Sequence, residues 1–160
     1  MAGEQGQAGF THRQDVLTIL NRDLANEMNT MLMYMADSLV AKGNDAGDIK
    51  ELASKFAKQD FKHVRQLAER IVELEGTPEL FPADVQNNAS IDAKMPREPH
   101  QRTLQPLLKD ALENEEQSVI EYRRQIQDLA FNDPATRLLL EEILTDKERQ
   151  MIKIHDMLGI

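Results

Sequence analysis

The stretch Asp48–Gly76 reads DIKELASKFAKQDFKHVRQLAERIVELEG and decides the fold. Apolar side chains recur along it at helical spacing, at Ile49, Leu52, Phe56, Leu67, Ile71 and Leu74. This pattern predicts one long amphipathic helix that ends with Gly76 as the left-handed residue after its cap. Asp60 and His63 stand in the middle of the apolar face, one helical turn apart and therefore side by side. Because a buried carboxylate and imidazole are costly without partners, the sequence predicts a compensating group, and a metal ion is the first candidate.

Three further segments show helical periodicity, namely Thr11 to about Lys42, Thr103 to about Phe131, and Asp133 to about Leu158. Residues 77–102 instead hold four prolines and no helical pattern. A connection this long is explained if it crosses the whole length of a bundle, which makes the second and third helices parallel. The sequence therefore predicts an all-α four-helix bundle over residues 11–160, preceded by a Gly- and Gln-rich disordered tail over residues 1–10.

Composition excludes several classes of function. The chain has 160 residues, enough for one domain with a real core, and a formal net charge of -9. Such acidity argues against a nucleic-acid partner, which needs a basic surface. Cysteine is absent, so disulfides, thiolate chemistry and iron–sulfur clusters are excluded. No apolar run reaches membrane-spanning length and the first residues do not resemble a signal peptide, so we expect a cytoplasmic protein without a membrane partner.

Polar residues also fall on the inward faces of the other three helices. Glu27 lies within the apolar stripe of the first helix. On the third helix, Glu115 and Glu116 project into the apolar face while Glu113 lies at its edge. Lys147 stands in the centre of the apolar stripe of the fourth helix. Carboxylates and imidazoles at this height, with acid and histidine spaced i, i+3, are the ligands of di-iron centres in four-helix bundles.

The chain resembles the ferritin-like superfamily, and within it bacterioferritin, over Val16–Leu158. The resemblance is carried by NEMNTMLMY at 26–34, by QDFKHVRQLAERIVELEGTPEL at 59–80 and by YRRQI at 122–126. It implies metal ligands at Glu27, Asp60, His63 and Glu115. Tyr34 falls at the family's core-tyrosine position, where we expect a hydrogen bond to a carboxylate of the second helix. The register set by YRRQI selects Glu115, whereas anchoring on ALE at 111–113 selects Glu113.

Two departures from the family decide the expected function. Lys147 and Gln150 occupy the positions where the family has Glu-x-x-His on the fourth helix. The resemblance therefore implies an iron-handling protein with impaired ferroxidase activity, in which Tyr34 and Lys147 stand at the reaction centre. We expect iron as the cofactor, as one or two ions, or no ion at all. Phe61 replaces the methionine that holds haem in the family, so haem is not expected.

Two other functions remain open, together with the state of assembly. In one, the buried network is closed by Lys147 and the bundle serves structure or partner binding; in the other, it is a di-iron oxidase or peroxide scavenger. A second apolar stripe on the first helix predicts a homo-oligomer, a dimer at least, and comprises Leu17, Met28, Leu32, Met35 and Leu39. The sequence stops at Ile160, without the short fifth helix of large iron-storing cages, so a shell of 24 subunits is not expected.

Overall fold

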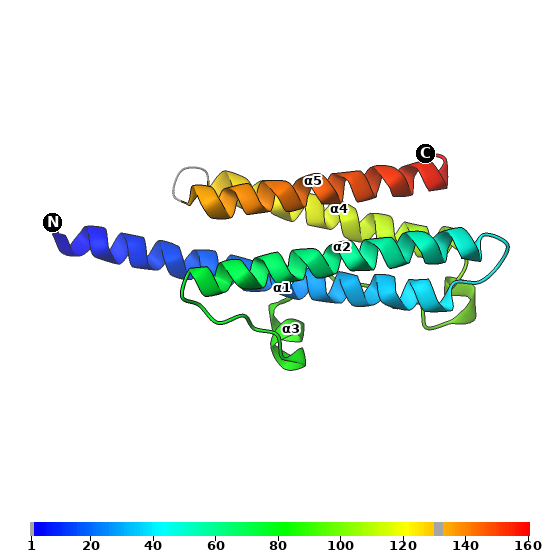
Figure 1. Cartoon of the computed structure of the whole chain (residues 1–160), viewed down its shortest axis with the longest axis horizontal. Coiled ribbons are helices and arrows are strands. Elements are labelled where there is room, and N and C mark those ends of the chain that lie inside the picture. The colour runs from blue at the N-terminus through cyan, green and yellow to red at the C-terminus, as the bar shows by residue number, and fades with distance from the viewer. Residues whose placement is uncertain (1, 130–132) are drawn as a thin grey trace.

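The computed structural model describes residues 2–129 and 133–160, with side chains from Arg13 onward, and shows a bundle of long helices (Figure 1). The helices are α1 (Ala2–Val40), α2 (Ala46–Glu73), α3 (Pro82–Asn88), α4 (Leu104–Asp128) and α5 (Pro134–Leu158), with a 3-10 turn at Pro99–Gln101. The four long ones confirm the predicted all-α bundle, and within these residues there is no strand. The expected end of the third helix near Phe131 lies outside the described residues.

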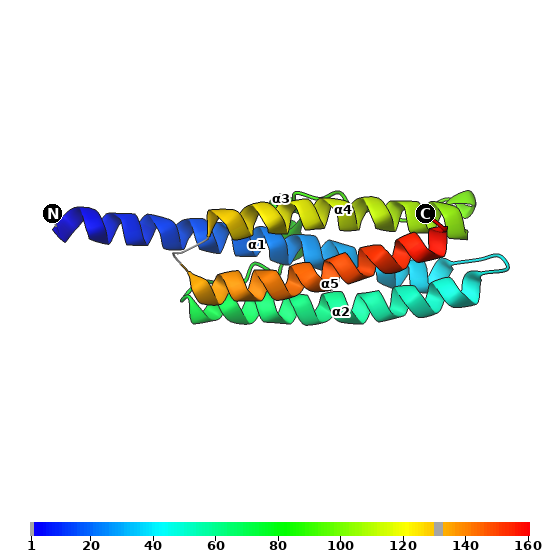
Figure 2. The ribbon, with the colours of Figure 1, turned by 90° about the horizontal axis from the view of Figure 1, so that it is seen from above.

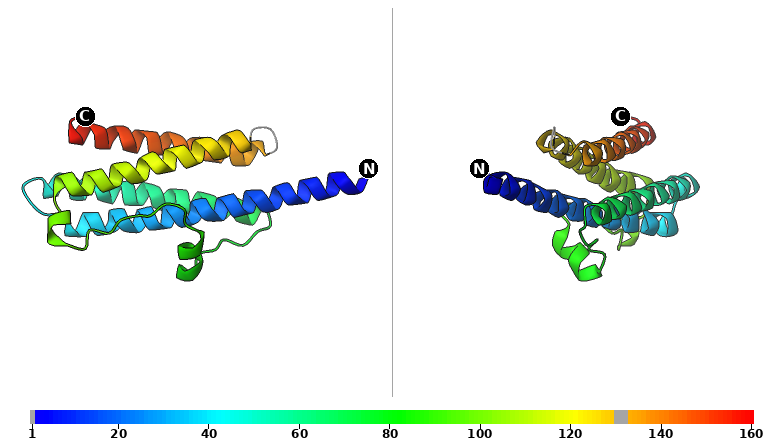
Figure 3. Two further views of the ribbon diagram at one scale, coloured as in Figure 1. Left: turned by 180° about the vertical axis from the view of Figure 1, so that it is seen from behind. Right: turned by 60° about the vertical axis from the view of Figure 1, so that its left-hand side comes forward.

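The four long helices form two antiparallel hairpins. α1 packs most extensively against α2, and α4 against α5 (Figure 2). Residues 77–102 run back along α1 from the end of α2 to the far end of the bundle, so that α2 and α4 are parallel (Figure 3). The prediction of a long crossover that makes the second and third long helices parallel is therefore confirmed. Among the described residues, no helix combines the length and apolar content that a membrane crossing needs.

The crossover is more ordered than its sequence indicates. It contains the short helix α3, with Pro82 in the first turn, where a missing N–H costs nothing. Asn26 of α1 holds the segment that follows, because its Oδ1 accepts from the backbone N–H groups of Ser90 at 2.9 Å and Ile91 at 3.0 Å. The expectation of no helix in this connection was wrong. α3 buries a single residue, Val85, and one buried position is too few to produce a helical pattern in the sequence.

Two helix starts and one helix end can be compared with the sequence predictions. α1 begins at Ala2, ahead of Thr11, whose side chain lies outside the described residues, and the disordered tail over residues 1–10 stays a prediction. Asp133 caps the start of α5 as expected, because its carboxylate accepts from the backbone N–H of Thr136 at 3.0 Å. α2 ends one residue earlier than expected, because Glu75 and not Gly76 is the left-handed residue, with φ 63°.

The apolar core of the described residues comprises two large clusters and a small third one of Ala41, Ile49 and Leu107. One large cluster lies towards the end of the bundle at which α2 ends and includes Leu20, Leu67 and Leu140. The other lies towards the opposite end and includes Met33, Phe56 and Ile154. The inward polar residues of all four long helices fall between the two large clusters, at mid-height. Water is excluded from both sides of this polar layer, so the charges in it are compensated within the protein.

Candidate metal centre

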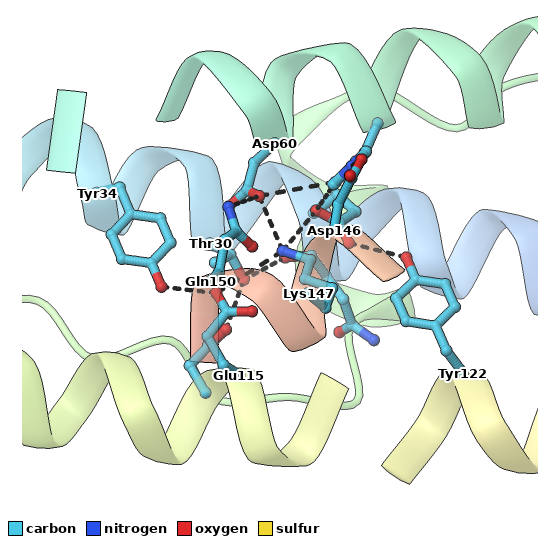
Figure 4. A network of polar contacts seen from close by, with 12 residues as sticks. Thr30, Tyr34, Asp60, Glu115, Tyr122, Asp146, Lys147 and Gln150 are labelled. Carbon is cyan, nitrogen blue, oxygen red and sulfur yellow. Dashed lines mark hydrogen bonds and ion pairs between the residues drawn. The ribbon is translucent and has the colours of Figure 1, made fainter. Parts of the chain in front are cut away.

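Charged and ionisable side chains from the four long helices meet around Lys147 in the middle of the bundle (Figure 4). Among them are Glu27 of α1, Asp60 and His63 of α2, Glu115 of α4 and Lys147 of α5, and each of these five is at most 2% exposed. The periodicity of each helix carries them there, because each replaces an apolar residue on the inward stripe. The structure thus brings together the four residues that the resemblance selects as ligands and the lysine that departs from it.

The ammonium group of Lys147 lies at the centre of this cluster. Its Nζ is 2.8 Å from Asp60 Oδ1, 3.0 Å from Glu27 Oε2 and 3.8 Å from Glu115 Oε1. Burial opposes a charge on the lysine, but the three carboxylates outweigh burial and raise the pKa of Lys147 above its ordinary value. The side chain therefore stays protonated and acts as an internal cation.

Glu27 and His63 are paired directly with each other. Glu27 Oε2 lies 3.4 Å from His63 Nδ1, and the hydroxyl of Tyr122 donates to Glu27 Oε1 at 2.8 Å. On its other side, His63 Nε2 lies 2.9 Å from Asp146 Oδ2. Burial disfavours the charged imidazole, yet Glu27 and Asp146 raise the pKa of His63. In that charged form both ring nitrogens are donors and neither offers a lone pair to a metal.

The pKa of Glu27 itself is lowered. Burial would raise it, but the charges of Lys147 and His63 and the donors around the carboxylate outweigh burial. For Asp60 and Glu115 the balance is reversed, and burial raises the pKa of both above ordinary values despite the neighbouring ammonium. The ammonium of Lys147 and the imidazole of His63 thus stabilise the negative charge of Glu27 more than those of Asp60 and Glu115.

Glu115 is held by the tyrosine that the sequence singled out. The hydroxyl of Tyr34 donates to Glu115 Oε1 at 2.6 Å, and the Tyr34 ring packs edge-on against Phe56 with centroids 5.3 Å apart. The expected partner of Tyr34 was a carboxylate of the second helix, and this expectation was wrong. The neighbouring acids lie outside the cluster: Glu113 is exposed and pairs with Lys94 at 2.7 Å, and Glu116, expected to point inward, is exposed.

Two contributors to the cluster were missed from the sequence. Tyr122 lies two helical turns after Glu115 on the same face of α4, which is a signal that could have been read. Asp146 directly precedes Lys147 and its side chain is 21% exposed, so no inward periodicity marks it. Gln150, expected where the family has histidine, is buried and donates from Nε2 to Asp60 Oδ1 at 3.3 Å.

The candidate ligands of the centre are partly occupied by Lys147. Glu27, Asp60 and His63 do offer ligand atoms within 4.8 Å of one another. However, an ammonium stands where a second bridging carboxylate is needed, and it already contacts Glu27 and Asp60. Within the described part of the chain, one oxygen each of Asp60, Glu115 and Gln150 has no hydrogen-bond partner. These three oxygens are the donor atoms of the centre that no described protein group occupies.

Comparison with solved structures shows the same fold in several bacterial proteins. A dodecameric thioferritin, the bacterioferritin-related protein of Bacteroides fragilis, superposes with a TM-score of 0.86 at 23% identity, covering 92% of this chain and 86% of that one. Dps from Thermosynechococcus elongatus gives a TM-score of 0.87 at 23% identity, covering 94% of both chains. The Dps protein of Vibrio cholerae O1, described as a ferritin-like diiron-carboxylate protein, gives 0.85 at 15% identity, covering 92% of this chain and 91% of that one.

The sequence was also compared with curated proteins and with models of protein families. No curated protein matches it significantly. The model of the ferritin family, described as the ferritin-like domain, matches residues 17–160. This range holds α1 from residue 17 onward, the other three long helices and every residue of the polar cluster. The chain belongs to the ferritin family.

Proposed function

We propose that this chain is an iron-handling protein whose bundle centre takes up at most one divalent ion and oxidises Fe(II) poorly. The observation that supports this proposal is the position of Lys147 Nζ, 2.8 Å from Asp60 and 3.0 Å from Glu27. Glu27, Asp60, Glu115 and Asp146 carry four negative charges when ionised, and the protonated Lys147 and His63 offset two of them. One divalent ion neutralises the two that are left. A second ion would lie against an ammonium group in a medium that screens their repulsion weakly.

The same position of Lys147 explains the low ferroxidase activity in this proposal. Reduction of dioxygen to peroxide takes two electrons, and one Fe(II) supplies only one. A centre that holds a single ion cannot deliver both electrons from adjacent metals. A di-iron oxidase or a peroxide scavenger also needs two adjacent iron ions, so we do not favour either function.

The test is an anaerobic Fe(II) titration followed by measurement of oxygen consumption. We expect at most one ion per subunit in the wild type and slow oxidation. The double variant Lys147→Glu/Gln150→His restores a bridging carboxylate and an imidazole, so its stoichiometry should rise towards two and its oxidation rate with it. Lys153→Glu, at an exposed position of the same helix, controls for the change of charge and should behave as the wild type. Two ions and rapid turnover in the wild type would overturn the proposal.

A second candidate is a bundle without catalysis that serves structure or partner binding. The favouring observation is that Lys147 and His63 supply internal cations to Glu27 and Asp60, so the fold does not need a metal to compensate these charges. This candidate predicts the same thermal unfolding temperature with chelator and with Fe(II). The iron-handling proposal predicts a higher temperature with Fe(II), because a ligand that binds only the folded state stabilises it.

Assembly belongs to the same proposal. Leu32, Met35 and Leu39 of α1 are 38%, 44% and 71% exposed, which supports a homo-oligomer, a dimer at least. The similar protein of Bacteroides fragilis is dodecameric, and we propose a dodecamer as the full assembly here. A cytoplasmic location completes this proposal.

A further inference from the structure

We infer that the single cation of the bundle centre binds on the Gln150 side of Lys147, to oxygen atoms of Asp60, Glu115 and Gln150, and not at the Glu27–His63 pair. The inference rests on the proposed function in one respect, that the centre takes up one ion. It goes further by assigning the position, the ligands and the chemical class of that ion. It also departs from the group of Glu27, Asp60 and His63 that lies closest together.

Among the described residues, three oxygen atoms on the Gln150 side of the cluster have no partner. Asp60 Oδ2, Glu115 Oε2 and Gln150 Oε1 are buried and have no hydrogen-bond partner in the described residues. The other polar atom of each side chain is engaged, by Lys147 for Asp60, by Tyr34 for Glu115 and by Asp60 for Gln150. Buried polar atoms without partners are uncommon in proteins, because each keeps the cost of lost hydration. Three such atoms come here from three helices of one cluster (Figure 4).

On the opposite side of the cluster, the polar atoms of Glu27 and His63 are all engaged. Glu27 receives Tyr122 on Oε1 and the ammonium of Lys147 on Oε2. Both nitrogens of His63 face carboxylates, Nδ1 towards Glu27 and Nε2 towards Asp146. A cation between Glu27 and His63 would have to displace the ammonium and break these contacts, whereas one on the Gln150 side breaks none of them.

The donor types define the class of ion. Two carboxylates and one amide carbonyl make an oxygen-only set, which suits hard divalent cations such as Mn²⁺, Mg²⁺ or Fe²⁺ and lacks the imidazole that favours Zn²⁺ and Cu²⁺. Asp60 and Glu115 together supply two negative charges to the ion, while Glu27 stays as the counter-charge of Lys147. Asp60 then lies between two cations, with Oδ1 on the Lys147 ammonium at 2.8 Å and Oδ2 free for the metal. In this arrangement the lysine replaces one metal ion of a pair, and Asp60 bridges the two.

The experiment titrates the full-length protein with Mn²⁺ alone and follows it by electron paramagnetic resonance. We expect one Mn²⁺ per subunit, without the electron spin echo modulation that a coordinated imidazole nitrogen produces. Gln150→Leu should weaken binding at least about tenfold, while His63→Gln, which keeps a donor towards Glu27, should leave the affinity within about threefold of wild type. Gln125→Leu removes a buried glutamine whose Oε1 is also unpartnered but lies outside the cluster, and it should bind as the wild type does.

Gln150→Glu separates loss of a ligand from loss of folding. It keeps an oxygen donor and adds a negative charge, so it should bind Mn²⁺ at least as tightly as the wild type. Imidazole modulation, loss of binding in His63→Gln alone, or unchanged binding in Gln150→Leu would overturn the inference while leaving a one-ion centre intact. A folded wild type that takes up Fe(II) but no Mn²⁺ would also overturn the inference alone. Two ions per wild-type subunit would overturn the proposed function instead.

Discussion

Lys147 Nζ lies 2.8 Å from Asp60 Oδ1, and neither side chain has exposed surface. Asp60 belongs to the α1–α2 hairpin and Lys147 to the α4–α5 hairpin, so this ion pair joins the two halves of the bundle across the polar layer. Charges removed this fully from water are stable only while each keeps its partner. The ammonium therefore takes over the structural role that a metal ion has in a carboxylate cluster.

Replacing Lys147 by Met should destabilise the protein by about 3–5 kcal/mol, because Asp60 and Glu27 then remain buried without their cation. Urea unfolding followed by circular dichroism measures this loss. Lys153→Met at an exposed position of the same helix should change the free energy of unfolding by less than about 0.5 kcal/mol. The double variant Lys147→Met/Asp60→Leu should recover part of the loss, since it removes an unpaired charge. A single variant as stable as its control would show that the ammonium does not hold the cluster together.

The sequence predicted which polar residues point into the bundle, but not which of them contact one another. Helical periodicity places Asp60, His63 and Lys147 inside, and the Pro-rich crossover fixes which helices run parallel, so convergence at mid-bundle follows from the sequence. Which acid Tyr34 reaches depends on the rotation of α4 against α1 and on a rotamer, and one-dimensional spacing carries neither. Asp146 was missed for the related reason that its side chain, which is only partly buried, reaches His63 from the edge of the inward face.

The end of α2 gives a prediction about stability. Glu75 is left-handed with φ 63°, while the N–H of Gly76 bonds to Ile71 O at 2.9 Å. Glycine at position 75 relieves the steric cost of this conformation, so Glu75→Gly should stabilise the protein by about 1 kcal/mol in thermal unfolding. Gly76→Ala should destabilise it, because an added Cβ would lie 2.5 Å from Leu17 Cδ2. The reverse order of the two variants would contradict the assignment of the cap.

The two tyrosines of the centre should contribute unequally. Tyr34 is the hydrogen-bond donor to Glu115, whose contact with Lys147 is long at 3.8 Å. Tyr122 instead donates to Glu27, which also has Lys147 at 3.0 Å and His63 at 3.4 Å. Tyr34→Phe should therefore cost about 1–3 kcal/mol of unfolding free energy and Tyr122→Phe about 1 kcal/mol or less, measured by urea unfolding at one pH. Equal losses would mean that Glu115 is compensated by another group.

The exposed apolar residues of α1 should form a subunit interface. Leu17 and Met28 of the predicted stripe pack against the chain's own core, which leaves Leu32, Met35 and Leu39 for a partner. A groove of about 650 Å³ between Leu32 and the crossover adjoins them. Leu32→Glu/Leu39→Glu should lower the mass measured by light scattering to that of a monomer, because buried unpaired carboxylates disfavour association. Lys109→Glu on α4 should keep the wild-type mass, and a monomeric wild type would contradict the interface.

Asp37 should make the stability depend on pH. Its side chain is 4% exposed with Oδ1 unpartnered, and burial, aided by the charge of Asp110, raises its pKa from 3.8 to about 7. A raised pKa means that the folded state binds the proton more tightly, so this contribution to stability is full below the unfolded pKa and is lost as the pH rises through about 7. One pKa unit corresponds to about 1.4 kcal/mol, so the wild type should lose at least about 1 kcal/mol between about pH 5 and 8.

Asp37→Asn is neutral at every pH and should flatten this profile, with its largest gain over the wild type at the alkaline end. Asp156→Asn, at an exposed position near the end of α5, should leave the profile unchanged. Denaturant midpoints measured across the pH range for the three proteins provide the comparison. The Asp110 carboxylate faces Asp37 from α4 and is itself 3.9 Å from Lys94, so high salt should weaken the Asp110 contribution and leave the larger effect of burial. A wild-type profile that rises from about pH 5 to 8 would show that Asp37 is ionised at little cost in the folded protein.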